Sequence, residues 1–362
     1  MVKKWLGVMG VVALVAWMSP GALAQVETQP LPEDLPGIDE MIFHGYIDFE
    51  FKDDDFAGKD QQVFDNHHFN LFFGSQIASN LRALGEIEIE HTGEEFKVEF
   101  AEIEWKPLGT DWLELVAGAI IVPFGLELRY HASPNNLLIS RPLAARSIIP
   151  GTWTDPGVVA RGTIATGNNS SFFYHVYANN GLSDKDKDGV FEQKDTKTAR
   201  DVNDDKALGF QIGFLPFPGL EVGASFQTGK WDLSEDFRYV MYGGHVDFKY
   251  KPFTLLAEGV VLDVEGSAAG GGDATLPGFY VLLAYDPIPK WQVVARFDWV
   301  DNEDGVVSTK QSITPGADER QVSIGLSYKP QPWLKLKVEY FNRELELEDD
   351  QNAFGFQVVA NW

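Results

Sequence analysis

The last nine residues of the chain read FGFQVVANW (residues 354–362). Successive side chains of a β-strand point to opposite faces, so the Phe, Phe, Val, Ala and Trp at the even-numbered positions share one face. Gln357 and Asn361 lie on the other face. A strand of this length with one apolar and one polar face suits a transmembrane β-barrel. We interpret it as the closing strand of a bacterial outer-membrane barrel.

The same alternation recurs upstream in about sixteen segments of roughly ten residues, the length that a tilted membrane strand needs. Glu86, Glu88 and Glu90, for example, share one face of their segment. In a barrel the apolar face meets lipid and the polar face lines the lumen. The sequence therefore predicts an all-β fold, a transmembrane antiparallel β-barrel of about 16 strands over residues 41–362.

The connections between these segments alternate in length. Five short ones carry proline, at 106–108, 216–219, 251–253, 286–289 and 329–332. Five longer and mostly acidic ones lie between them, at 52–62, 122–156, 181–206, 266–277 and 301–319. Short periplasmic turns and long outer loops are typical of outer-membrane barrels, and this order gives an even number of strands. A soluble β-sandwich or a secreted β-propeller is the alternative, but blade signatures are not apparent.

The first 40 residues indicate export. Lys3 and Lys4 precede an apolar run from 5 to 18 and a small-x-small site ending at Ala24, the pattern of a cleavable signal peptide over 1–24. Residues 25–40 are rich in proline and polar residues, and we expect an extended periplasmic lead-in. These features predict the Gram-negative outer membrane as the destination, with membrane lipid and lipopolysaccharide as surroundings.

Composition excludes several classes of function. The 54 acidic residues outnumber the 29 lysines and arginines, for a net charge of −25. This balance argues against a nucleic acid partner, which requires a basic surface. The chain has no cysteine, so thiolate chemistry and Cys-ligated metals are excluded. No local motif indicates an enzyme, and we expect no cofactor to be required.

Three motifs carry a family resemblance. GAIIVPFGLE (118–127), RPL (141–143) and DPGV (155–158) resemble, in this order, the phosphate-selective porin O/P family and related general porins. The resemblance implies a sixteen-stranded barrel, usually a homotrimer, with an inward-folded third outer loop that narrows the pore. The strands here offer many Glu and Asp residues and few Lys residues, which departs from the basic lumens of the family's phosphate members.

The third outer loop, about residues 122–156, is the longest connection and carries a local excess of positive charge. Opposed charges across a pore set its ion preference. We therefore predict a constriction with a positive side at Arg129, Arg141, Arg146 and Arg161 and a negative side at Glu86, Glu88 and Glu90. Alternatively, these arginines pair with wall carboxylates and hold the loop in place.

The fourth outer loop contains DKDKDGVFEQKD (184–195), which fits the D-x-D-x-D-G calcium pattern. The expected Ca²⁺ ligands are Asp184, Asp186, Asp188, the carbonyl of Val190, and Asp195. Asp195 stands where glutamate normally closes such a site. A solvated acidic loop is the alternative.

Several tryptophans and two adjacent histidines fit structural roles. Tryptophans near the predicted periplasmic strand ends indicate an interface girdle, at 105, 112, 291, 333 and 362. His67 and His68 are neighbours in one predicted strand, so we expect them to point to opposite faces and to make a poor metal site.

These observations predict a porin, a barrel that passes small hydrophilic solutes or ions passively, with a preference for anions or phosphate through the loop arginines. Two other classes remain open. A plugged barrel would serve as a surface scaffold, an adhesin or a sheath for a partner protein. An outer-membrane enzyme would hydrolyse lipid or peptide.

Overall fold

The computed structural model describes residues 41–54, 61–126, 129–184, 191, 201–266, 272–302, 318–346 and 350–362. The predicted signal peptide and lead-in (1–40) lie outside them and stay predictions. The strands are β1 (Met41–Asp54), β2 (Gln61–Asp65), β3 (His68–Ala78), β4 (Leu81–Glu90), β5 (Glu95–Trp105), β6 (Glu114–Ile121), β7 (Thr154–Ala165), β8 (Ser171–Asn179), β9 (Ala207–Phe217), β10 (Leu220–Lys230), β11 (Arg238–Tyr250), β12 (Phe253–Val264), β13 (Ala274–Ile288), β14 (Trp291–Asp301), β15 (Asp318–Gln331), β16 (Leu334–Leu345) and β17 (Gln351–Asn361).

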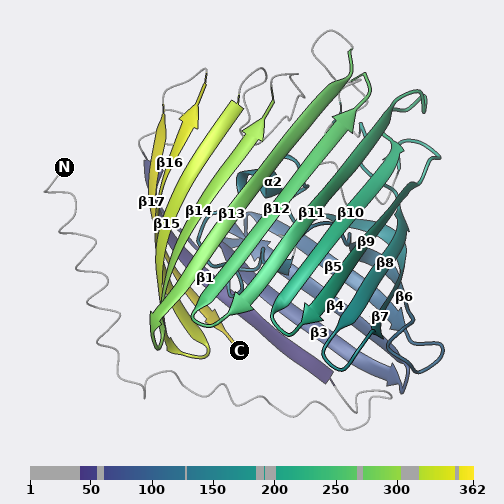
Figure 1. The fold of residues 1–362 in the computed structure, drawn as a ribbon, viewed down its shortest axis with the longest axis horizontal. Coiled ribbons are helices and arrows are strands. Elements are labelled where there is room, and N and C mark those ends of the chain that lie inside the picture. The colour runs from purple at the N-terminus through teal and green to yellow at the C-terminus, as the bar shows by residue number, and fades with distance from the viewer. Residues whose placement is uncertain are drawn as a thin grey trace, which may run out of the picture. The chain divides into compact units, whose positions relative to one another are not determined.

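Every strand pairs antiparallel with its neighbours in one continuous sheet, and the sheet closes on itself (Figure 1). Closure comes from β1, which pairs with β17 along its length, from Tyr46 opposite Asn361 to Asp54 opposite Ala353. On its other side β1 pairs with β2 and β3. These two strands are successive parts of one wall strand, so the wall has sixteen strands and the predicted barrel is confirmed.

The wall carries polar side chains on its inner face and apolar side chains on its outer face, the reverse of a soluble protein. On β16, Lys335, Lys337 and Glu339 are buried, whereas Val338 and Tyr340 are exposed. The buried side chains face the lumen and the exposed apolar ones face outward. Lipid cannot solvate a charge at low cost, so this arrangement is the one that a membrane requires.

Other exposed side chains support the same conclusion. The tryptophans at 105, 112, 291, 333 and 362 are all exposed, as an interface girdle requires. Among the residues that the structure describes, no helix is both long and apolar enough to span a membrane.

The third loop packs against the inside of the barrel. It spans 122–153, and its described residues include the short helix α2 (Leu143–Ser147). The loop is shorter than predicted, because β7 begins at Thr154 and its first residues already pair with the end of β6. We call residues 122–153 the inner loop, since their partners are lumen-facing side chains.

Candidate functional site

Carboxylates of the wall accept hydrogen bonds from the backbone of the inner loop. Oε1 of Glu258 lies 2.7 Å from the backbone nitrogen of Leu126. Oε2 of Glu339 lies 2.7 Å from the nitrogen of Ser140, and Oδ1 of Asp298 lies 2.9 Å from that of Leu143. Buried N–H groups need acceptors, and carbonyls within the loop satisfy several of them. Carboxylates of the wall satisfy these three.

Cationic side chains of the wall satisfy the loop carbonyls in the same way. Nζ of Lys335 donates to the carbonyl of Asn136 (2.8 Å), and Nζ of Lys337 donates to the carbonyls of Ser133 (2.8 Å) and Leu138 (2.9 Å). Arg296, which also pairs with Asp298, donates to the carbonyl of Ser140 (2.8 Å). Hydrogen bonds to charged groups contribute about 1.5–3 kcal/mol each, so these contacts fix the course of the loop.

Apolar packing also holds the loop in the lumen. Phe124, Ile148 and Trp153 of the loop belong to one buried cluster with inward-facing side chains of strands between β6 and β14. A second cluster joins the middle of the loop to β12, β13 and β14. The loop is thus packed against a large part of the wall.

Charged side chains gather in two cavities, one at each end of the barrel. The loop-side cavity, of about 880 Å³, lies at the end that carries the long connections. Arg141 and Arg146 of the inner loop line it together with Glu88, Glu90 and Glu99 of β4 and β5. Its lining contains six carboxylates, four lysines or arginines, and four histidines. This cavity brings two of the predicted arginines together with two of the predicted glutamates.

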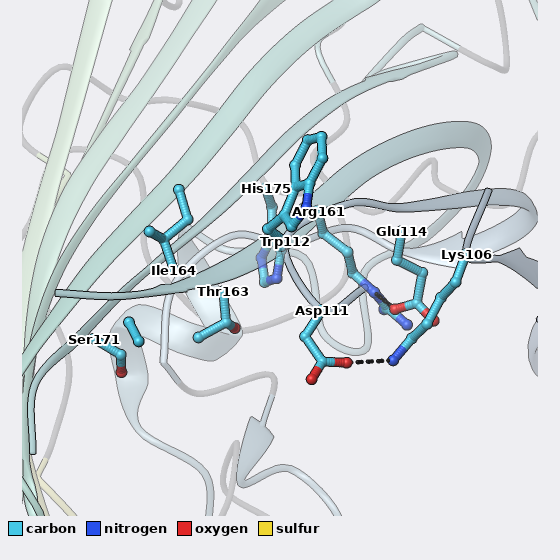
Figure 2. A pocket seen from close by; sticks show the side chains of 11 residues that line it. Lys106, Asp111, Trp112, Glu114, Arg161, Thr163, Ile164, Ser171 and His175 are labelled. Atoms are coloured by element: carbon cyan, nitrogen blue, oxygen red, sulfur yellow. Dashed lines mark hydrogen bonds and ion pairs between the residues drawn. The ribbon is translucent and has the colours of Figure 1, made fainter. Parts of the chain in front are cut away.

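The turn-side cavity, of about 900 Å³, opens between the turns that join β5 to β6 and β7 to β8. Figure 2 shows Arg161 reaching Glu114, and their Nε and Oε2 atoms are 2.8 Å apart. Arg161 also binds Glu104. At the rim, Nζ of Lys106 lies 2.8 Å from Asp111 (Figure 2). Arg161 is therefore bound by carboxylates, away from Arg141 and Arg146.

Arg129 lies apart from both cavities, on the inner loop opposite β10. Its Nη1 donates to Oε2 of Glu221 at 3.0 Å, and Nη2 donates to the other carboxylate oxygen. Burial disfavours its charge, but the hydrogen bonds and the charge of Glu221 raise the pKa of Arg129 above its usual value. Arg129 therefore ties the loop to the wall, as the alternative interpretation of the loop arginines expected.

Arg146, near the end of α2, has other guanidinium groups as neighbours, unlike Arg129. Burial, together with the neighbouring guanidinium groups of Arg343 and Arg296, lowers the pKa of Arg146 to about 10. The carboxylates of Asp298 and Glu319 oppose this shift. The wall near Arg146 is therefore rich in cationic groups as well as acids.

The three predicted glutamates of β4 share neighbours on the lumen face. Nδ2 of Asn70 lies 2.5 Å from Oε1 of Glu86 and 2.8 Å from Oε2 of Glu88. Glu90 pairs with Lys97 of β5. Glu88 and Glu90 border the loop-side cavity, whereas Glu86 lies next to it along the strand.

Most of the predicted calcium loop lies outside the described residues. Asp186, Asp188, Val190 and Asp195 fall there, and their role stays a prediction. Asp184 is described and buried, and its backbone nitrogen donates to the carbonyl of Trp231 at 2.9 Å.

The prediction that His67 and His68 point to opposite faces is wrong. Their rings lie with centroids 3.8 Å apart, and both line the loop-side cavity. The pairing of β1 explains the difference. Asp65 lies opposite Glu50 and Phe69 lies opposite Ile47, so three residues between these pairs on one strand face two on the other. This β-bulge adds one residue and turns the second histidine toward the same face as the first.

A closed sixteen-stranded barrel with a charged interior, an apolar exterior and a loop packed inside it defines the class of outer-membrane-type porin barrels. Within that class, the chain belongs to the family described as "Putative beta-barrel porin-2, OmpL-like", whose model matches residues 48–358. The porin likeness is thus confirmed, whereas membership of the phosphate-selective O/P family is not.

Individual relatives agree with this assignment. An uncharacterised protein of Aquifex aeolicus (strain VF5) is 26% identical, over 81% of this chain and 73% of that one. An anion-selective porin from Comamonas acidovorans superposes with a TM-score of 0.63 at 9% identity, over 89% of this chain and 99% of that one. OmpT of Vibrio cholerae in a trimer form gives a TM-score of 0.58 at 12% identity, with the same two coverages. At these identities the two solved structures show the fold alone.

Proposed function

We propose that this protein is a passive diffusion channel of the outer membrane for small hydrophilic solutes and ions, without catalysis. The observation that carries the proposal is the pair of charged cavities, one at each end of the lumen. The inner loop packs on lumen-facing side chains of many strands, and charged cavities lie at both ends of the barrel. Polar side chains of β4 and β5, including Glu86 and Glu104, lie between the two cavities along the wall. We propose that these cavities are the two ends of one water-filled path.

The ion preference follows from the charges that line this path. Arginines of the inner loop would favour anions or phosphate, as the sequence predicted. However, carboxylates bind Arg129 and Arg161, and the loop-side cavity carries more carboxylates than lysines and arginines. We therefore propose a modest preference for cations at neutral pH, with Arg141 and Arg146 opposing Glu88 and Glu90 across the cavity.

The test is the single-channel conductance and reversal potential of the refolded barrel in a planar bilayer under a KCl gradient, with and without phosphate. We expect stepwise conductance and a reversal potential on the cation side. Arg141→Ala should move the reversal potential further toward that of K⁺, whereas Arg320→Ala, an exposed arginine of β15, should not. Anion preference that Arg141→Ala reduces would restore the prediction made from the sequence.

One observation favours a second candidate, a plugged barrel that acts as a surface scaffold or as a sheath for a partner protein. The inner loop is bound to strands on several sides of the lumen, including β10 at Glu221, β16 at Lys337 and β1 at Asp48. A correctly folded barrel without any conductance would support this candidate and overturn the channel.

The oligomeric state, the export and a calcium site are also proposed. We propose that the barrel is a homotrimer, as in the trimer form of the Vibrio protein, and cross-linking in detergent would test this. We also propose export by the signal peptide at 1–24. Finally, we propose calcium binding at 184–195, which would stabilise the outer surface beside lipopolysaccharide.

A further inference from the structure

Three histidines from two separate segments meet at the loop-side end of the barrel. His67 and His68 come together through the bulge between β2 and β3. His91 begins η2 (His91–Gly93), the turn that joins β4 to β5, and its backbone nitrogen donates to the carbonyl of His67 at 3.1 Å. The ring centroids of His67 and His91 are 5.1 Å apart. We call these three residues the histidine cluster.

Carboxylates surround the cluster and orient its rings. Nδ1 of His67 lies 3.3 Å from Oε1 of Glu50, and Nδ1 of His68 lies 2.9 Å from Oδ2 of Asp48. A carboxylate accepts a hydrogen bond from the ring N–H that faces it, which leaves the lone pair on the other nitrogen, Nε2. Histidines that bind metals are usually oriented in this way by a carboxylate behind the ring.

We propose that Asp65, His67 and His91 bind one divalent first-row transition metal ion of the Zn²⁺ class. Their ligand atoms lie within 4.8 Å of one another, and Nδ1 of His91 lies 2.8 Å from Oδ2 of Asp65. Zinc bonds to nitrogen and oxygen are about 2.0–2.2 Å long, so neighbouring ligands in a tetrahedral site are about 3.3 Å apart. Small side-chain rotations close the site, and water takes the fourth position.

His67 and His91 each belong to a second group of close ligand atoms as well. His67 shares its second group with Asp48 and His68, so an ion that moved to that group would keep His67 as a ligand. The oxygen of Glu50 behind its ring makes Glu50 a positioning residue.

The ligand set selects the kind of metal. Imidazole nitrogen suits Zn²⁺, Ni²⁺ and Cu²⁺, whereas Ca²⁺ and Mg²⁺ prefer sites made only of oxygen. The three members of the cluster line the loop-side cavity, so an ion can reach them from solvent. This proposal does not depend on the channel function, because a plugged barrel would present the same residues.

The experiment measures metal binding directly, by calorimetry on the refolded full-length barrel in detergent, without a polyhistidine tag. We expect one Zn²⁺ per chain, with no comparable heat from CaCl₂ or MgCl₂. His67→Ala should abolish this binding. Glu50→Gln should weaken it by about 10- to 100-fold, as loss of an orienting carboxylate does. His44→Ala provides the matched control, because His44 stacks on Phe72 and belongs to no group of close ligands.

A folding check and a spectroscopic signature complete the experiment. Circular dichroism of each variant shows whether the barrel is intact. If His67→Ala does not fold, Asp65→Asn, which changes only one heavy atom, replaces it. Cu²⁺ bound to the wild type should show nitrogen couplings from imidazole in its EPR spectrum. Zn²⁺ binding that survives in folded His67→Ala and Asp65→Asn barrels would overturn the proposal, as would equal binding of Ca²⁺.

Discussion

Nζ of Lys337 on β16 lies 2.8 Å from the carbonyl oxygen of Ser133 in the inner loop, so a buried cation joins the wall to the loop. The same ammonium group reaches the carbonyl of Leu138 at 2.9 Å. The bend of the loop between these two residues is therefore held around one side chain.

Lys337→Met should loosen this bend, because it leaves two buried carbonyls without their charged donor. We expect the free energy of unfolding to fall by about 1–3 kcal/mol and the open-channel current to become noisier. Urea unfolding and single-channel recording measure the two effects. Lys251→Met, in an exposed turn, is the control. A variant as stable and as quiet as the wild type would show that apolar packing alone holds the loop.

Gly125 illustrates how tightly the loop meets the wall. Its φ is +74°, and a Cβ atom there would overlap Oε1 of Glu258, the carboxylate that binds the next backbone nitrogen. Left-handed backbone costs a residue with a Cβ about 1–2 kcal/mol even without a clash. We therefore expect Gly125→Ala to lower both stability and folding yield.

Gly259→Ala is the matched control for Gly125→Ala. Gly259 lies in β12 next to Glu258, and the nearest atom to an added Cβ is 3.7 Å away, an ordinary contact. Urea unfolding of the two variants should separate them by at least about 1 kcal/mol. Equal stability would mean that the loop can move away from β12 at little cost.

The barrel was predictable from the sequence because its signal is local. Alternation within each segment and the lengths of the connections depend on neighbouring residues only. The partners of the inner loop are different, because Glu258 and Leu126 are 132 positions apart and nothing in either segment marks the contact. The prediction considered loop arginines against wall acids, whereas Glu258, Glu339 and Asp298 bind loop backbone instead.

The histidine cluster was missed for a related reason. Alternation assigns neighbouring residues to opposite faces, and that rule holds only in an uninterrupted strand. The bulge before His68 shows itself only in the pairing of β2 and β3 with β1. The two adjacent histidines and the nearby acids were visible, but their common direction depends on this register.

Glu90→Gln should reduce the proposed cation preference. Glu90 borders the loop-side cavity, pairs with Lys97 and lies on the same strand as Glu86. Removing one of the six carboxylates of that lining makes the net charge of the lining less negative, so Arg141 and Arg146 have more influence on passing ions. The reversal potential under a KCl gradient should move toward that of Cl⁻. Glu344→Gln, an exposed change on β16, should leave it in place. If both variants behave alike, the narrowest part of the path lies elsewhere.

Zn²⁺ should reduce the cation current when it is added on the side of the long loops. An ion at Asp65, His67 and His91 places two positive charges in a cavity that otherwise favours cations, and unlike charges on an exposed surface these are only partly screened. We expect micromolar ZnCl₂ to lower the K⁺ conductance, a chelator to restore it, and MgCl₂ at the same concentration to have little effect.

Two variants show whether Zn²⁺ reduces the current by binding at the histidine cluster or at other residues. His67→Ala should no longer respond to Zn²⁺, whereas His44→Ala should keep the response. A response that persists in His67→Ala would place the blocking ion at other residues. Zn²⁺ binding by calorimetry without any change in current would instead mean that the histidine cluster lies beside the conducting path, along the wall formed by β1 to β4, and that ions pass closer to Arg141 and the inner loop.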